Sequence, residues 1–210
     1  MCHAVDGCPH PGCPPLCPSD PSPLPRSARN NYRGNAGLGG AYQTTAEYPD
    51  SGNGLLPELG RVTPAHAVDG LSHTAAVSER VRGSGPRATL SPERDVTSLS
   101  GLRYTADDLL TACRAAARAD KLIYGGAGSF WLWTAREFSI YTHTQEPNGR
   151  IPDGLDLYGY AGYGMMTARS RHPGGVNVLM GDGSTRFFKE SISRDVWRGF
   201  GTRSGGELVD

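Results

Sequence analysis

Residues 176–189 read VNVLMGDGSTRFFK, and this run predicts a β-hairpin. Residues 176–180 are mostly β-branched and other apolar side chains, which favour a strand. Asp182 and Gly183 form an Asp-Gly pair, which supplies the positive φ that a tight hairpin turn needs. Residues 184–189 then return as the partner strand. The C-terminal third of the chain therefore contains a two-stranded unit whose apolar face must be buried by another element.

A short helix is expected directly after the hairpin. Ser193 is a typical N-cap residue, and Asp195 lies near the positive end of the helix that follows. The apolar residues Val196, Trp197 and Phe200 are expected to face the core. The sequence therefore predicts a hairpin with a helix docked on it.

The clearest longer helix is expected from Thr105 to Asp120. Thr105 is a suitable N-cap, with Asp108 three residues later as its capping-box partner. An apolar face at helical spacing is made of Leu109, Leu110, Ala112, Cys113, Ala116 and Ala117. Further extended segments are expected at 74–79, 130–133 and 138–142, whereas residues 30–40 are rich in Asn and Gly and predict a loop.

Length and composition favour one loop-rich α+β domain with a mainly antiparallel sheet. The chain has 210 residues, of which 29 are Gly and 16 are Pro, and Leu, Ile, Val and Phe supply fewer than a fifth. Lys and Arg balance Asp and Glu at 21 each. Zero net charge argues against a nucleic-acid partner. No apolar run approaches the about 20 residues that span a bilayer.

The N-terminus differs in composition from the rest. Residues 1–15 are expected to be a disordered, Pro- and Cys-rich extension, and residues 16–210 a single domain. One alternative is a zinc site made by Cys8, His10, Cys13 and Cys17. The cysteine spacings differ from the paired two-residue knuckles of common zinc sites, so an incidental tail or ordinary disulfides are also open.

Two features are candidates for tying the domain together. In an oxidising compartment Cys17 and Cys113 are a possible disulfide, whereas in the cytosol both would stay thiols. Asp153, Asp156 and Asp182 offer hard oxygen ligands for Ca²⁺. Aspartates are also common in turns without any metal, which is the favoured interpretation.

The search for chemistry leads to His172 and Asp182, which could form a base and its orienting carboxylate. No nucleophile is marked by its context, and the structural interpretation is preferred. In that interpretation His172 bonds a backbone carbonyl, Gly174 and Gly175 allow a bend, and Asp182 serves the turn. Glu79 lies in a segment that otherwise looks buried, and it is expected to bond a backbone donor or an arginine.

The segment from Ser170 to Ser184 resembles the prepilin-type processing-associated motif, in which His is followed by nine residues and Asp-Gly. Its characteristic positions in this chain are His172, Gly174, Gly175, Asn177, Asp182 and Gly183. Residues 16–21, 31–40, 69–79 and 197–207 resemble other parts of the same family. This is a large family of exported, prepilin-like proteins of unknown function that is abundant in planctomycete bacteria. The resemblance covers about residues 16–210.

The resemblance implies a pilin-like globular head behind a leader and a long hydrophobic helix, as in type IV pilins and type II secretion pseudopilins. It implies a non-enzymatic structural or interaction role in the cell envelope or outside the cell. Other pilin-like subunits or envelope components are the implied partners. It assigns no catalytic residue, metal or cofactor, and gives the motif residues a structural role.

The sequence departs from the family pattern at its start. Residues 1–25 contain no leader, no long helix and no secretory signal, so a truncated or mis-started product is expected. Such a head would expose the apolar patch that the helix covers in its relatives.

Two other functions are carried as alternatives. One is a secreted binding module for an envelope polysaccharide or another surface ligand, using Phe130 to Trp133, which exposed tryptophans would favour. The other is a hydrolase that uses His172 and Asp182. It requires these two residues to line a cleft with a hydroxyl or thiol within hydrogen-bond reach.

Overall fold

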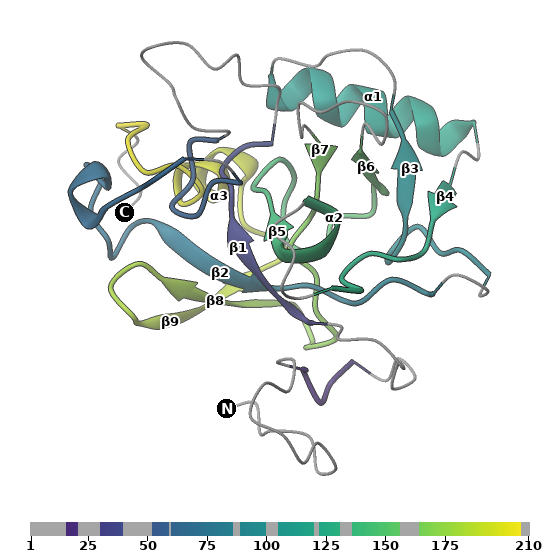
Figure 1. Cartoon of the computed structure of the whole chain (residues 1–210), viewed down its shortest axis with the longest axis horizontal. Coiled ribbons are helices and arrows are strands. Elements are labelled where there is room, and N and C mark those ends of the chain that lie inside the picture. Colours follow the sequence, from purple (N-terminus) through teal and green to yellow (C-terminus); the bar gives the residue numbers. More distant parts are fainter. Residues whose placement is uncertain are drawn as a thin grey trace.

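A computed structural model describes residues 16–20, 30–39, 52–58, 60–85, 89–99, 105–119, 122–130, 136–155 and 164–206. Within these residues the chain forms two sheets and a few mostly short helices (Figure 1). The strands are β1 (Tyr32–Asn35), β2 (Ala75–Glu79), β3 (Val96–Ser98), β4 (Leu122–Tyr124), β5 (Ile140–Tyr141), β6 (Asp153–Leu155), β7 (Gly164–Met165), β8 (Gly175–Met180) and β9 (Thr185–Lys189). The helices are the 3₁₀ turn η1 (Pro64–His66), α1 (Ala106–Arg118), α2 (Arg136–Ser139) and α3 (Arg194–Gly199).

The larger sheet has the strand order β5-β1-β2-β8-β9. The β1–β2, β2–β8 and β8–β9 pairs are antiparallel, and only the edge pair β1–β5 is parallel among them. The predicted hairpin is therefore confirmed as β8–β9, with Val178 opposite Arg186. Its first strand joins the rest of the sheet through β2, which comes from the region expected to be extended at 74–79.

The smaller sheet has the order β4-β3-β6-β7, and α1 packs against β3, β6 and β7 (Figure 1). The Thr105 hydroxyl accepts a hydrogen bond from the Asp108 N–H at 3.1 Å, which confirms the predicted N-cap. Leu109, Leu110 and Cys113 are buried on the face that meets this sheet. The expected α+β architecture with mostly antiparallel pairing is thus confirmed.

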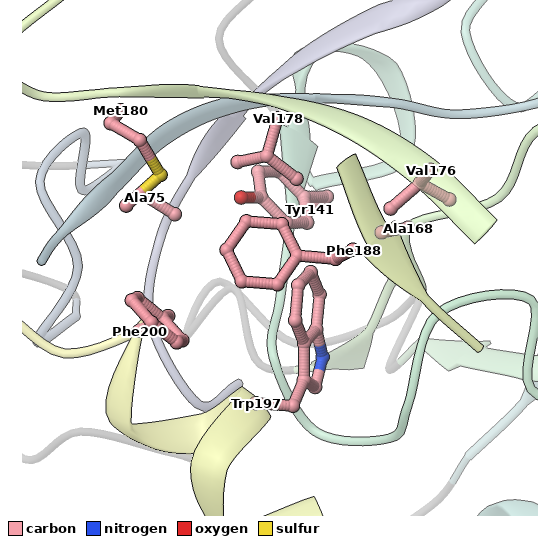
Figure 2. Packing of buried hydrophobic residues seen from close by; sticks show 9 residues of the cluster. All are labelled: Ala75, Tyr141, Ala168, Val176, Val178, Met180, Phe188, Trp197 and Phe200. Atoms are coloured by element: carbon pink, nitrogen blue, oxygen red, sulfur yellow. The ribbon is translucent and has the colours of Figure 1, made fainter. Parts of the chain in front are cut away.

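The main core lies between the larger sheet and α3. Figure 2 shows Trp197 of α3 and Phe200, the C-cap of that helix, directed toward Phe188 of β9, with Val178 and Tyr141 beyond it. The rings of Phe188 and Trp197 meet edge to face with centroids 5.5 Å apart. Burying aromatic groups of this size contributes most of the stabilisation that a small core supplies.

Several local expectations were wrong. Residues 32–35 form β1 rather than a loop, because pairing with β2 and β5 overrides the weak strand propensity of Asn and Gly. The expected strand at 138–142 is the end of α2 followed by the two residues of β5. Val196 is 36% exposed rather than in the core. The residue at 130 is not in a strand, and residues 1–15 and 131–135 lie outside the described residues.

Buried ion pairs link the two sheets. Asp153, in β6, pairs with the guanidinium of Arg80 just after β2 and with that of Arg169 at 3.3 Å. Thr167 donates to Asp153 Oδ1 from both its backbone N–H and its hydroxyl, at 3.0 and 2.7 Å. Among the helices of the described residues, none combines the length and apolarity of a membrane span.

Candidate functional site

Three separate segments bring Cys17, Glu79 and His172 together. Cys17 lies in the described segment 16–20, Glu79 ends β2, and His172 precedes β8. His172 Nε2 lies 3.0 Å from Glu79 Oε1 and 3.7 Å from Cys17 Sγ, and Cys17 Sγ lies 3.9 Å from Glu79 Oε1. The three atoms therefore form a compact triangle of thiol, carboxylate and imidazole.

Glu79 is held in place by the strand beside it. Its side chain is 3% exposed, and its Oε2 accepts a hydrogen bond from the backbone N–H of Asn177 at 2.9 Å. The Asn177 side-chain amide lies 3.2 Å from the same oxygen. The same amide lies 3.3 Å from Oε1, the oxygen that lies 3.0 Å from His172 Nε2. The expectation that Glu79 bonds a backbone donor is thus confirmed for Oε2.

The Cys17 segment is anchored by a buried polar chain. The Cys17 N–H donates to Asn31 Oδ1 at 3.0 Å, and Asn31 Nδ2 donates to Asp20 Oδ2 at 2.8 Å. Arg82 also donates from Nε to Asp20 Oδ2, at 3.1 Å. Because these groups are buried, their loss would leave polar atoms without partners, which favours one position for the thiol.

The cluster opens onto a surface pocket of about 880 Å³, which we call the site pocket. His172 is 35% exposed along its side chain, so the cluster is reachable from solvent. The pocket combines polar and apolar lining side chains, namely Cys17, Pro18, Ser19, Tyr32, Val77, Glu79, His172, Asn177, Leu179 and Thr185.

One nitrogen makes every described side-chain contact of His172. Nε2 lies close to Glu79 Oε1, to Cys17 Sγ and to Ser19 Oγ, the last at 3.4 Å. In a nucleophile–base–carboxylate relay the two ring nitrogens divide these partners between them. In this site the three described side-chain partners of His172 lie around the same nitrogen.

Asp182, Gly174 and Gly183, three other residues of the expected motif, lie in or next to the β8–β9 hairpin. Asp182 accepts hydrogen bonds from the N–H and hydroxyl of Ser184 at 2.9 and 2.7 Å, and the hydroxyl contact holds the pKa of Asp182 below its ordinary value. Gly174 and Gly183 have φ values of 81° and 86°. The carboxylate that contacts His172 is thus Glu79 and not Asp182, and the imidazole contacts side chains rather than a backbone carbonyl.

The structure does not contain the possible disulfide between Cys17 and Cys113. Both residues are thiols. Cys17 lies in the polar cluster with Glu79 and His172, whereas Cys113 packs with Leu109 and Leu110 in the core under α1. The two thiols belong to different layers, so that expectation is corrected by the fold.

The positive charges around Asp153 disfavour the calcium site considered from the sequence. Asp153 is flanked by two buried guanidinium groups, which repel a cation. Burial by itself raises the pKa of Asp153, but the charges of Arg80 and Arg169 and the Thr167 hydrogen bonds outweigh it and lower that pKa. Asp182 is used by its turn, and residue 156 lies outside the described residues.

The N-terminal zinc alternative falls largely outside the described residues, because positions 8, 10 and 13 are among those not described. Its fourth member, Cys17, contacts Glu79 and His172 instead. The aromatic segment proposed for polysaccharide binding is described only at Phe130, which is 49% exposed and packs edge to face on Phe138 at 5.3 Å.

Sequence reasoning missed that Glu79, Ser19 and Cys17 share a site with His172. The available signal was a carboxylate at a position where β2 is otherwise buried, BBiBB along its five residues. A charged residue in such a strand needs a specific partner, but the sequence does not say which one.

A family model described as "Protein of unknown function (DUF1559)" matches residues 15–195. Searches of curated proteins and of solved structures found no match to the chain. The matched region contains the hairpin, the Cys17 segment and all three members of the cluster. Because the match spans most of its length, the chain belongs to this DUF1559 family of proteins of unknown function.

Proposed function

We propose that the chain is a non-enzymatic structural or interaction module that corresponds to the head of a pilin-like or pseudopilin-like exported protein. Its place of action is the cell envelope or the cell exterior, and its partners are other pilin-like subunits or envelope components. Nucleic acid is not among the proposed partners, because the chain has no net positive charge. The observation that carries the proposal is an apolar face on the larger sheet.

The apolar side chains of this outer face are Tyr32, Val77, Leu179 and Phe187, and the polar residues Glu79, Asn177 and Thr185 lie among them. The strand register places Val77 opposite Leu179, and Leu179 opposite Thr185, on the side away from the Trp197 core. Leu179 is 39% exposed and Phe187 is 48% exposed. Sheets in globular domains bury apolar faces against another layer, and an exposed apolar patch is typical of an interaction site.

The outer face is also hollowed. The site pocket of about 880 Å³ and a second pocket of about 650 Å³ are both lined by Tyr32 and Val77. Leu56, which is 44% exposed, borders the second pocket beside Gly34. Hollows of this kind accept anchoring side chains of a partner, which is how interfaces concentrate their binding energy.

The test is photo-crosslinking in cells that express the native gene. A photoreactive phenylalanine analogue replaces Phe187 in one strain and Val68 in another. Val68 is a matched control, because it is 78% exposed but does not belong to the outer face. The proposal expects envelope-fraction crosslinks from position 187 to pilin-like or envelope proteins, and few from position 68.

Mass spectrometry of the fractionated cells gives the compartment and the native N-terminus in the same experiment. A product found only in the cytoplasmic fraction, or equal crosslinking from both positions, contradicts the proposal. Substitution of Leu179 by Lys provides a second arm. It places a charge in the proposed interface and should reduce the crosslinks from position 187 several-fold while the fold, followed by circular dichroism, is retained.

A further inference from the structure

We propose that Cys17, Glu79 and His172 bind one divalent transition-metal ion, for which Zn²⁺ is the fitting ion. Their ligand atoms all lie within 4.8 Å of one another and come from three separate segments of the chain. Thiolate, imidazole and carboxylate are the ligand types that Zn²⁺ takes in proteins. A thiolate and a carboxylate together also balance the charge of a divalent ion.

The triangle has the dimensions of a tetrahedral site. Ordinary zinc–ligand bond lengths and tetrahedral angles give edges of about 3.6 Å for S···N, about 3.4 Å for N···O and about 3.6 Å for S···O. The observed edges are 3.7 Å between Cys17 Sγ and His172 Nε2, 3.0 Å between Nε2 and Glu79 Oε1, and 3.9 Å between Sγ and Oε1. One ion between the three atoms therefore needs shifts of only a few tenths of an ångström.

The contacts of His172 favour an ion over a proton as the shared partner. A neutral imidazole has at most one hydrogen on Nε2, so it can donate to only one of Glu79 Oε1, Cys17 Sγ and Ser19 Oγ. A metal ion bonded to Nε2 instead satisfies the imidazole, the carboxylate and the thiolate together. This is why the arrangement points to a metal rather than to an activated nucleophile.

Outer contacts orient the ligands in advance. Asn177 holds the Glu79 carboxylate through its backbone N–H, which donates to Oε2, and through its side-chain amide, which lies 3.2 Å from Oε2 and 3.3 Å from Oε1. Asn31 fixes the backbone of Cys17. Outer contacts of this kind position metal ligands, and their loss commonly lowers metal affinity roughly 10–100-fold.

The fourth position of the tetrahedron is assigned to water. Ser19 Oγ lies 3.0 Å from Cys17 Sγ and 3.4 Å from His172 Nε2, within reach of such a water. The partial exposure of His172 and the adjoining site pocket provide access. This inference does not rest on the proposed function, although the ion would open onto the same site pocket that the outer face contains.

The test uses the full chain, purified under reducing conditions and stripped of metal, and titrated by calorimetry with Zn²⁺ and by absorbance with Co²⁺. The result expected is one tightly bound ion per chain, with Co²⁺ giving a thiolate charge-transfer band. Cys17→Ser and His172→Ala should each lower the Zn²⁺ affinity at least about 100-fold, and Cys17→Ser should also abolish the Co²⁺ band. Asn177→Ala should lower the affinity roughly 10–100-fold.

Matched controls separate this site from others in the chain. Cys113→Ala and His73→Ala, which remove a core thiol and an exposed imidazole, should leave binding unchanged. A chain with Cys2, Cys8 and Cys13 replaced by Ser should also keep the site. The proposal is overturned if the wild-type chain binds no Zn²⁺, or if binding survives Cys17→Ser and His172→Ala but is lost in the triple-serine chain. Circular dichroism of each variant confirms that it is folded.

Discussion

The backbone N–H of Asn177 donates to the Glu79 carboxylate at 2.9 Å, which ties a charged group of β2 directly to β8. Glu79 is almost fully buried, so its loss should cost more than that of a surface acid. Glu79→Leu leaves the Asn177 N–H without its acceptor and should lower the unfolding free energy by about 1–3 kcal/mol. Glu79→Gln keeps an acceptor oxygen and should cost less.

Urea unfolding at pH 7 measures these changes. The control is Glu93→Gln, because the Glu93 side chain is 65% exposed and its pair with Arg171 lies at the surface. That variant should stay within about 0.5 kcal/mol of the wild type. Equal losses from Glu79→Leu and Glu93→Gln would contradict the structural role of the Asn177 contact.

The adjacent glycines Gly174 and Gly175 should respond differently to replacement by alanine. A Cβ at Gly175 would lie 2.1 Å from the carbonyl oxygen of Phe188, so the β8–β9 pairing would have to shift. Gly174 has a φ of 81° and open space around it, so Gly174→Ala should cost only the strain of the left-handed conformation, about 1–2 kcal/mol. Thermal unfolding should show a larger loss for Gly175→Ala, and the reverse order would refute this account.

His143 should make stability fall in acid. Burial lowers the pKa of His143 from 6.5 to about 3, despite the opposing hydrogen bond to the Trp197 carbonyl. Between pH 6.5 and pH ~3, His143 is therefore protonated in the unfolded chain but neutral in the folded chain. The unfolding free energy should decline below pH 6.5 with a slope approaching about 1.4 kcal/mol per pH unit.

Urea unfolding between pH 7 and pH 4 gives that slope. The variant His143→Gln should be less stable at pH 7, because it loses the buried contacts of the imidazole. Because glutamine does not titrate, its unfolding free energy should also depend less on pH in this range. His73→Gln removes an exposed histidine and should keep the wild-type slope. A steep slope retained in His143→Gln would assign the acid sensitivity to another group.

Breaking the ion pairs of Asp153 should be among the most costly single changes. Asp153→Asn leaves the buried Arg80 and Arg169 without their counter-ion, which costs about 3–5 kcal/mol in comparable cases. The surface pair of Asp107 with Arg198 is the control, since the Asp107 side chain is 73% exposed and Asp107→Asn should cost less than about 1 kcal/mol.

Asp153 should add a second loss of stability at lower pH. Because the pKa of Asp153 is lower in the folded chain than in the unfolded one, its contribution is complete above pH ~4 and is lost as the pH falls through the folded value. The acid profile of Asp153→Asn should therefore differ from that of the wild type mainly below pH ~4. A difference confined to pH 5–7 would contradict this assignment.

Local sequence was sufficient for the elements whose signals are short-range. The Asp-Gly turn, the Thr105 cap and the Ser193 cap act over a few residues, and the hairpin, α1 and α3 form where they were predicted. By contrast, β1 is built from residues that favour loops and exists because β2 and β5 pair with it. Short strands of this kind depend on partners that are distant in sequence.

For the candidate site, the sequence by itself marked His172 as a candidate, predicted that Asp182 serves a turn and indicated that Glu79 needs a partner. Only the tertiary structure decided that Glu79 and Cys17 are the residues that His172 meets. These contacts span 93 and 155 residues of sequence. Their choice depends on the register of β2 against β8 and on the anchoring of Cys17 by Asn31, and no local propensity encodes either.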